Sequence, residues 1–140
     1  FGAVKDVVIE NVKLHDNNVG GLDCTPGPCY NLTVRDSQFY NNGIQAGFGA
    51  DGIGIEVGNN VLIENVSSIN NGGDGIDLCS RNPLFIDSSA NVTVRESIIS
   101  NNGMQGLKLW SSGRVINCLI HSNGLEGLVI VYNGEYLIQN

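Results

Sequence analysis

Four side chains in the sequence could together carry out metal-dependent proton chemistry: Asp51, Asp74, Asp77 and Lys108. Carboxylates are the hard oxygen ligands that Ca²⁺ prefers, and stacked carboxylates repel one another unless a cation or a proton lies between them. A lysine beside such a cation, and partly removed from water, has a lowered pKa that suits a proton-abstracting base. These residues are therefore a candidate calcium and base site if the fold brings them together.

Whether they meet depends on an internal repeat that runs along the chain. Each unit has alternating apolar residues that end at a polar anchor, then an asparagine six residues later, then a Gly-apolar-x-apolar element. The anchors are Asn11, Asp36, Asn65, Glu96 and Asn117, the asparagines are Asn17, Asn42, Asn71, Asn102 and Asn123, and the glycines are Gly21, Gly52, Gly75, Gly106 and Gly127. Apolar residues with a period of two between Asn and Gly turns are typical of short strands, and no helical pattern separates them.

The repeat predicts an all-β fold, a single-stranded parallel β-helix (solenoid) of five to six coils, with residues 1–140 as one domain. The leucine-rich repeat, which has a similar length, is excluded because its Leu-x-x-Leu-x-Leu frame is absent. Equivalent residues of stacked coils lie about 4.8 Å apart, so each position of the repeat becomes a column along the axis.

Three kinds of column are expected. Apolar columns form the core, for example Ile9, Val34, Ile63, Val94 and Val115. The five repeat asparagines form a ladder of paired amides inside a turn, where Asn tolerates the left-handed conformation. On the outside, Glu10, Arg35, Glu64 and Arg95 alternate in sign and predict a column of ion pairs.

The columns also bring the candidate site residues together. Asp51 and Asp74 each precede the glycine of their element, on adjacent coils, and Asp77 follows three residues after Asp74. Lys108 occupies the position of Asp77 on the next coil. A simpler interpretation stays open, in which Asp74 belongs to a turn with Gly75, and Asp77 and Lys108 form an ordinary surface ion pair.

Residues beside this cluster are candidates for substrate binding. Trp110 lies two residues after the lysine on the same face, and an exposed tryptophan favours a ligand that stacks on its ring. Two insertions, residues 43–50 and 79–90, flank the same strand column, and such loops gather on the binding face of a solenoid. Arg81 and Arg114 are further candidates for contacts with a substrate.

Composition excludes several classes of protein. The 140 residues are 41% hydrophobic and 15% charged, as in a folded chain and unlike a disordered one. The formal charge of −7 argues against a nucleic-acid partner and permits bound cations. No apolar run approaches a membrane span, and residues 1–6 lack the pattern of a signal peptide. Neither end has a capping helix, so we expect a fragment of a longer β-helix or end-to-end self-association.

Four segments between residues 50 and 127 occur in a recognisable order. They are Ala50-Asp51-Gly52-Ile53, Asn71-Gly72-Gly73-Asp74-Gly75-Ile76-Asp77-Leu78, Gly106-Leu107-Lys108-Leu109 and Asn117-Cys118-Leu119-Ile120-His121-Ser122-Asn123. In this order they resemble the active-site coils of the family-nine polysaccharide lyases, which are right-handed parallel β-helix pectate lyases. Gly73 stands where that family has the first aspartate of a pair.

The resemblance implies a calcium-dependent enzyme that acts on acidic, pectate-type polysaccharides. Asp51, Asp74 and Asp77 would be the calcium ligands and Lys108 the Brønsted base. Calcium would neutralise the uronate carboxylate, Lys108 would take the C5 proton, and the C4 oxygen would leave by β-elimination. Activity is then expected to rise towards alkaline pH.

Two other functions stay open. A polygalacturonase-like hydrolase also places aspartates on adjacent coils, but its Gly-His-Gly and Arg-Ile-Lys signatures are absent, and His15 and His121 fall in a different outward column. A noncatalytic β-helix that serves as a structural, adhesive or glycan-binding module would need none of this chemistry. The lyase-like segments favour an enzyme over the module.

The cysteines and the substrate class bear on localisation. Cys24 and Cys29 flank a short loop that a disulfide could close, and no zinc-type Cys or His spacing is present. By analogy with other polysaccharide-facing β-helices, we expect a secreted or cell-surface protein.

Overall fold

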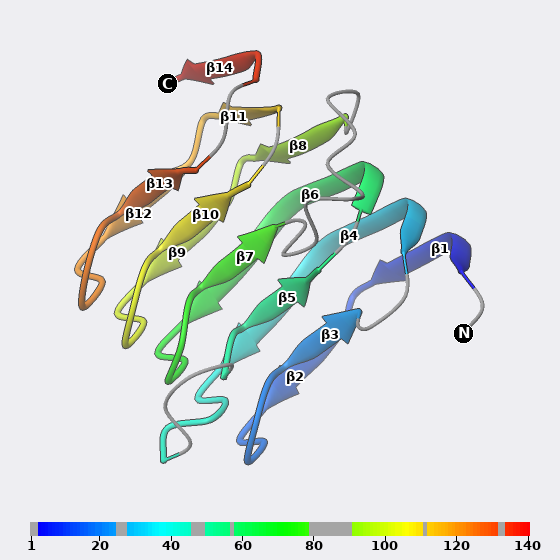
Figure 1. Cartoon of the computed structure of the whole chain (residues 1–140). Coiled ribbons are helices and arrows are strands. Elements are labelled where there is room, and N and C mark those ends of the chain that lie inside the picture. The colour runs from blue at the N-terminus through cyan, green and yellow to red at the C-terminus, as the bar shows by residue number, and fades with distance from the viewer. Residues whose placement is uncertain are drawn as a thin grey trace.

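Stacked parallel strands form the described part of the chain. The computed structural model describes residues 3–24, 28–45, 50–56, 58–78, 91–110, 112–131 and 134–140. Its strands belong to two sheets, and every strand pairing is parallel. The predicted all-β parallel β-helix is therefore confirmed, and Figure 1 shows its coils stacked in chain order, with β1 and β14 at opposite ends of the stack.

The larger sheet has nine strands. In spatial order its main path holds β1 (Val4–Glu10), β4 (Cys29–Tyr40), β6 (Gly58–Ile69), β8 (Val92–Arg95), β11 (Gly113–Ile116) and β14 (Tyr136–Gln139). It is extended by β2 (Lys13–His15), β9 (Ile98–Ser100) and β12 (Leu119–His121). β2 pairs with β4, and β9 pairs with both β6 and β12.

The smaller sheet carries one strand from each of five coils. Its members are β3 (Leu22–Cys24), β5 (Ile53–Ile55), β7 (Ile76–Leu78), β10 (Leu107–Leu109) and β13 (Leu128–Ile130), which follow one another in space as in sequence. Each of these strands is the apolar-x-apolar part of a repeat element. Because the two apolar residues point inward, the middle residue points outward, and this outward column carries the candidate site.

The core follows the predicted columns. The register pairs Ile9 with Val34, Val34 with Ile63, Ile63 with Val94, and Val94 with Val115. The three middle members of this column are completely buried. Burial of one apolar side chain per coil in each column contributes roughly 1.5–3 kcal/mol per residue, which explains why the coils hold their register.

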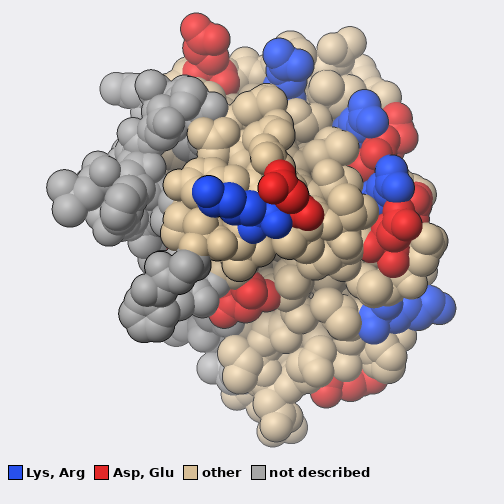
Figure 2. Space-filling model, turned by 90° about the vertical axis from the view of Figure 1, so that its right-hand side faces the viewer, with Lys and Arg blue, Asp and Glu red and all other residues tan. Residues whose placement is uncertain are grey.

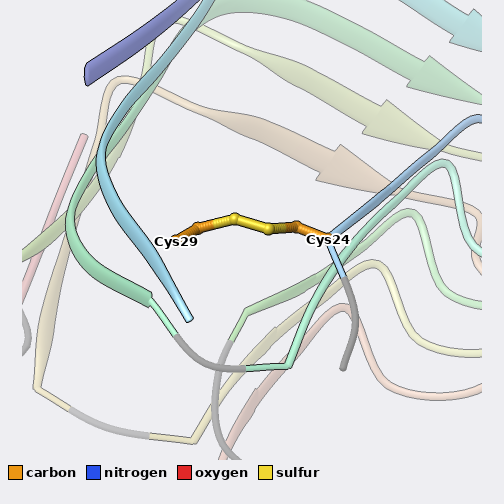
Figure 3. The surroundings of a disulfide bond; sticks show 2 residues. All are labelled: Cys24 and Cys29. Atoms are coloured by element: carbon orange, nitrogen blue, oxygen red, sulfur yellow. A yellow bond between two sulfur atoms is a disulfide. The ribbon is translucent and has the colours of Figure 1, made fainter. Parts of the chain in front are cut away.

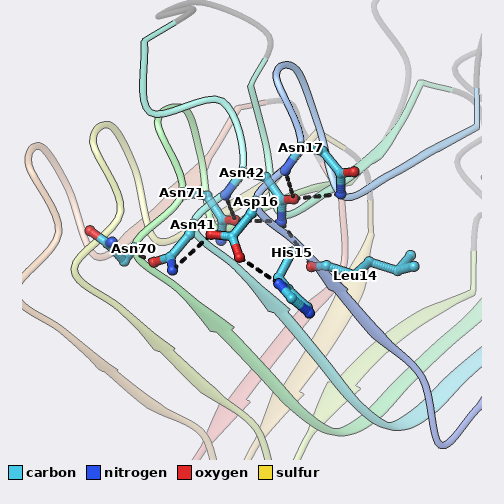
Figure 4. Close-up of polar contacts among 8 residues, drawn as sticks. All are labelled: Leu14, His15, Asp16, Asn17, Asn41, Asn42, Asn70 and Asn71. Atoms are coloured by element: carbon cyan, nitrogen blue, oxygen red, sulfur yellow. Dashed lines mark hydrogen bonds and ion pairs between the residues drawn. The ribbon is translucent and has the colours of Figure 1, made fainter.

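The predicted asparagine ladder is confirmed, with one correction to its backbone. Each side-chain amide donates to the amide oxygen of the next coil, at 2.8 Å from Asn17 to Asn42 and 2.9 Å from Asn42 to Asn71 (Figure 4). The two remaining steps continue to Asn102 and Asn123 at 2.9 and 3.0 Å. The left-handed conformation falls on the preceding residue instead, since positive φ angles occur at Asp16, Asn41, Asn70, Asn101 and Ser122.

The outward column of ion pairs is confirmed for two pairs of neighbours. Arg35 contacts Glu10 and Arg95 contacts Glu64, each at 2.5 Å, on the exposed surface of the larger sheet. Exposed pairs of this kind contribute less than about 1 kcal/mol. On the face shown in Figure 2, acidic and basic side chains lie next to one another in small mixed groups.

A disulfide joins two neighbouring strands. Cys24 at the end of β3 is bonded to Cys29 at the start of β4 (Figure 3), which confirms the pairing that the sequence allowed. Cys118 is a free thiol, and Cys79 lies outside the described residues. Across the described chain, no helix is long and apolar enough to cross a membrane.

Candidate functional site

The structure brings the four predicted residues together on the outer face of the smaller sheet. Lys108 of β10 pairs with Asp77 of β7, which in turn pairs with Gly54 of β5. Asp51 and Asp74 stand two residues before β5 and β7. Ligand oxygens of the three aspartates all lie within 4.8 Å of one another, close enough for a shared metal ion.

Asp74 is the most deeply buried member of this carboxylate cluster, with 4% of its side chain exposed. Its Oδ2 accepts a hydrogen bond from the Lys108 ammonium, and its Oδ1 accepts the backbone N–H of Gln105 at 2.9 Å. The backbone N–H of Asp74 donates to Asp51 Oδ1 at 2.8 Å. Asp74 is therefore tied to the coil on either side of it.

Asp77 lies beside the lysine and the tryptophan. The Trp110 indole N–H donates to Asp77 Oδ1 at 2.6 Å, and Lys108 Nζ lies 3.6 Å from Asp77 Oδ2. The exposed fractions of the Asp77 and Lys108 side chains are 12% and 14%. The ion pair of the simpler interpretation is therefore present, but it is less solvated than an ordinary surface pair.

Burial and like charge act together on Asp51. The pKa of Asp51 is raised to about 6, mainly because the carboxyl is removed from water. The charges of Asp74 and Asp77 also raise it, whereas the Asp74 N–H and Lys108 lower it. For Lys108, burial lowers the pKa, but the hydrogen bond to Asp74 and the three negative charges outweigh it and raise the pKa overall. The lowered lysine pKa that we expected beside a cation is thus not produced by the protein groups alone.

The raised pKa of Asp51 predicts a loss of stability between about pH 4 and pH 6. Within this window the folded state holds a proton that the unfolded state releases, so the free energy of unfolding falls as the pH rises. Asp51→Asn keeps the acceptor oxygen and lacks the titration, so we expect its stability relative to wild type to increase by about 2 kcal/mol from pH 4 to pH 7. Urea unfolding of both proteins at several pH values measures this. A constant difference across the window would contradict the prediction.

The other sequence-based candidates are distributed differently. Trp110 belongs to the site and is partly buried, with its ring against the core. Arg114 is exposed on β11 of the larger sheet, so it does not join the carboxylate cluster. Arg81 lies outside the described residues. His15 and His121 end β2 and β12 of the larger sheet, away from the aspartates, as their column predicted.

Two contributors were not singled out from the repeat. The backbone N–H of Gln105 donates to Asp74. Gln105 follows Asp74 in the same column of the repeat, and this position could have indicated the contact. Gly54 stands between Asp23 and Asp77 in the register, where neighbouring coils carry carboxylates. The sequence shows that this position of the column lacks a side chain. Whether the glycine leaves space for a ligand depends on which atoms surround it in the structure.

The residues present fit a calcium ion by two criteria. The donor set consists of carboxylate oxygens, which Ca²⁺ prefers. A Cβ added to Gly54 would lie 3.5 Å from Asp51 Oδ2 and 3.8 Å from Asp23 Oδ1, so the glycine leaves room for a ligand between acidic side chains. Gly73 adds no fourth carboxylate, because its position approaches Asp51 and the Ala50 backbone too closely for any side chain without a shift.

The stacked parallel coils agree with the comparisons, which show that the chain belongs to the right-handed β-helix family. The model of that family, described as a right-handed β-helix region, matches residues 2–140. Among curated proteins, the mannuronan C5-epimerase AlgE5 of Azotobacter vinelandii is 31% identical over 99% of this chain. The chain spans 13% of the length of that relative. No solved structure matches the chain.

Proposed function

We propose that this β-helix is a carbohydrate-active domain that acts on uronate polymers at the Asp51, Asp74, Asp77 and Lys108 cluster. The convergence of three carboxylates and one ammonium on an outward strand column is the observation that carries the proposal. The similarity to an enzyme named for C5 epimerisation of mannuronan supports a uronate substrate.

The chemistry shared by uronate lyases and C5-epimerases is removal of the C5 proton. The electron pair left at C5 is delocalised into the uronate carboxylate. It then either expels the C4 oxygen, which gives an unsaturated sugar, or accepts a proton on the opposite face, which inverts C5. A calcium ion held by Asp51, Asp74 and Asp77 would supply positive charge that makes the C5 proton more acidic.

Lys108 is the residue that we propose as the base. Its contacts with Asp74 and Asp77 hold the ammonium in the outward column of the smaller sheet, next to the carboxylates that could bind calcium. The raised pKa of Lys108 means that the neutral form is scarce at neutral pH. Activity should therefore increase with pH as the neutral form of Lys108 becomes more abundant.

The test combines metal binding with two product assays. Calorimetry with Ca²⁺ on wild type and Asp77→Asn should show binding that the variant weakens, while Asp36→Asn, a carboxylate loss in the larger sheet, leaves it unchanged. Polymannuronate and polygalacturonate are then incubated with Ca²⁺ in D2O. Ultraviolet absorbance of the unsaturated product reports elimination, and deuterium at C5 with inverted configuration reports epimerisation. If neither product forms with either polymer, an enzymatic role is refuted.

A second candidate function is binding of uronate polymers without catalysis. It is favoured by the raised pKa of Lys108, since the ion pair with Asp74 disfavours the neutral form that a base requires. Sedimentation of the protein with polymannuronate in the presence of Ca²⁺, without any product, would support this alternative.

A secreted or cell-surface location is part of the proposal. The Cys24–Cys29 disulfide is typical of an oxidising compartment, where uronate polymers also occur. Separation of cell and medium fractions of the source organism tests it directly.

Gly54→Ala offers a test of the site that leaves the fold intact. The added methyl would make only ordinary contacts, so we expect the free energy of unfolding to stay the same or rise by about 0.5–1 kcal/mol. Calcium affinity should fall by about tenfold or more, because the methyl fills space beside Asp51. Gly113→Ala on β11, where a Cβ is also tolerated, is the matched control and should bind Ca²⁺ like wild type. Unchanged affinity in Gly54→Ala would contradict the prediction.

A further inference from the structure

Trp110 is the only tryptophan in the chain, and it contacts both kinds of charged group in the site. Its indole N–H donates to Asp77 Oδ1 at 2.6 Å, from the next coil of the solenoid. Lys108 Nζ lies 5.8 Å from the centroid of its ring. We propose that Trp110 is a positioning residue, which fixes the orientation of Asp77 and thereby the geometry of the carboxylate cluster.

The two oxygens of Asp77 have different surroundings. Oδ1 accepts the indole N–H, whereas Oδ2 lies on the side of the Lys108 ammonium, at 3.6 Å. A carboxylate that lost the indole donor could rotate about its Cβ–Cγ bond and exchange these two oxygens. The tryptophan therefore selects which oxygen points towards the other charged groups.

Trp110 is itself held firmly. Its ring packs against the hydrophobic core, and its backbone N–H donates to the carbonyl of Leu78 at 3.1 Å, which continues the ladder between β7 and β10. A donor that the core holds in place loses little entropy when it binds a carboxylate. Outer hydrogen-bond partners of this kind orient metal-ligating groups, and their loss typically weakens metal affinity by about 10–100-fold.

The inference rests on the proposed function for its consequence, since orientation of Asp77 matters to calcium only if the cluster binds it. Calorimetry with Ca²⁺ on Trp110→Phe is the first experiment, because phenylalanine keeps an aromatic ring in the core and removes the donor. We expect the dissociation constant to rise by about tenfold or more. Tyr40→Phe, an aromatic change in the larger sheet, should leave it unchanged. A Trp110→Phe protein that is folded by circular dichroism and binds Ca²⁺ like wild type would overturn the inference.

The indole proton gives a second readout that does not depend on calcium. With one tryptophan, the ¹⁵N NMR spectrum has a single indole N–H signal. We expect this proton to exchange slowly with solvent, and its signal to shift and exchange faster in Asp77→Ala, which removes the acceptor. A fast-exchanging indole proton in wild type that Asp77→Ala does not affect would refute the positioning role, even if calcium binds. A wild type that binds no calcium but has the protected indole would refute the calcium site and leave the orientation of Asp77 intact.

Discussion

Asn71→Ala is expected to lower the free energy of unfolding by about 4 kcal/mol, the largest effect of any substitution considered for this protein. Asn71 is 1% exposed. Its Oδ1 accepts the backbone and side-chain N–H groups of Asn42 at 3.2 and 2.9 Å, and its Nδ2 donates to Phe39 O, Ser68 Oγ and Asn102 Oδ1. Alanine would leave several of these buried groups without partners, and each such group costs roughly 1–3 kcal/mol. Urea unfolding measures the loss.

The matched control is the neighbouring residue. Asn70 is exposed, has a φ of 56°, and donates to Asn41 Oδ1 in a second, outer row of amides (Figure 4). Asn70→Gly removes that amide and tolerates the left-handed backbone, so it should cost less than about 1 kcal/mol. If both variants lost the same free energy of unfolding, burial of the inner amide ladder would not increase its contribution to stability.

Asp74→Asn is expected to lower the free energy of unfolding by about 3 kcal/mol at neutral pH and to abolish calcium binding. The substitution removes the charge that faces Lys108, and Asp74 and Lys108 are 4% and 14% exposed. A buried ammonium that loses its main partner has a large desolvation penalty, which the nearby Asp77 offsets only in part. Urea unfolding and calorimetry measure the two effects.

Two further variants separate charge from packing. Asp36→Asn replaces an exposed carboxylate in the larger sheet and should change stability by less than about 0.5 kcal/mol. The double variant Asp74→Asn with Lys108→Met removes both charges, so most of the lost stability should return while calcium binding stays absent. If the double variant were as unstable as Asp74→Asn, the loss would not come from the unpaired lysine.

The columns of this protein could be predicted from its sequence because a parallel solenoid has a simple register. Ile9, Val34 and Ile63 occupy the same position in successive repeats, and the strands pair them directly. The same rule placed Lys108 beside Asp77. Loops of different length between the repeats do not disturb it, since each coil is realigned by the burial of its own apolar residues.

The details within a column could not be predicted in this way. The left-handed residue precedes each ladder asparagine, because the asparagine itself must point its amide along the inner row. Trp110 was expected to be an exposed stacking platform, but its ring is partly buried and its N–H binds Asp77. A repeat gives the position of a side chain in the coil and says nothing of its rotamer.

The division between these two groups of results has one physical cause. Which residues become neighbours follows from the period of the apolar pattern, a property of the chain taken one coil at a time. Three properties depend on contributions from several coils at once. They are the raised pKa of Asp51, the direction of the Lys108 pKa shift, and the space that Gly54 leaves for a ligand. Those contributions of burial, charge and hydrogen bonding exist only once the coils are stacked.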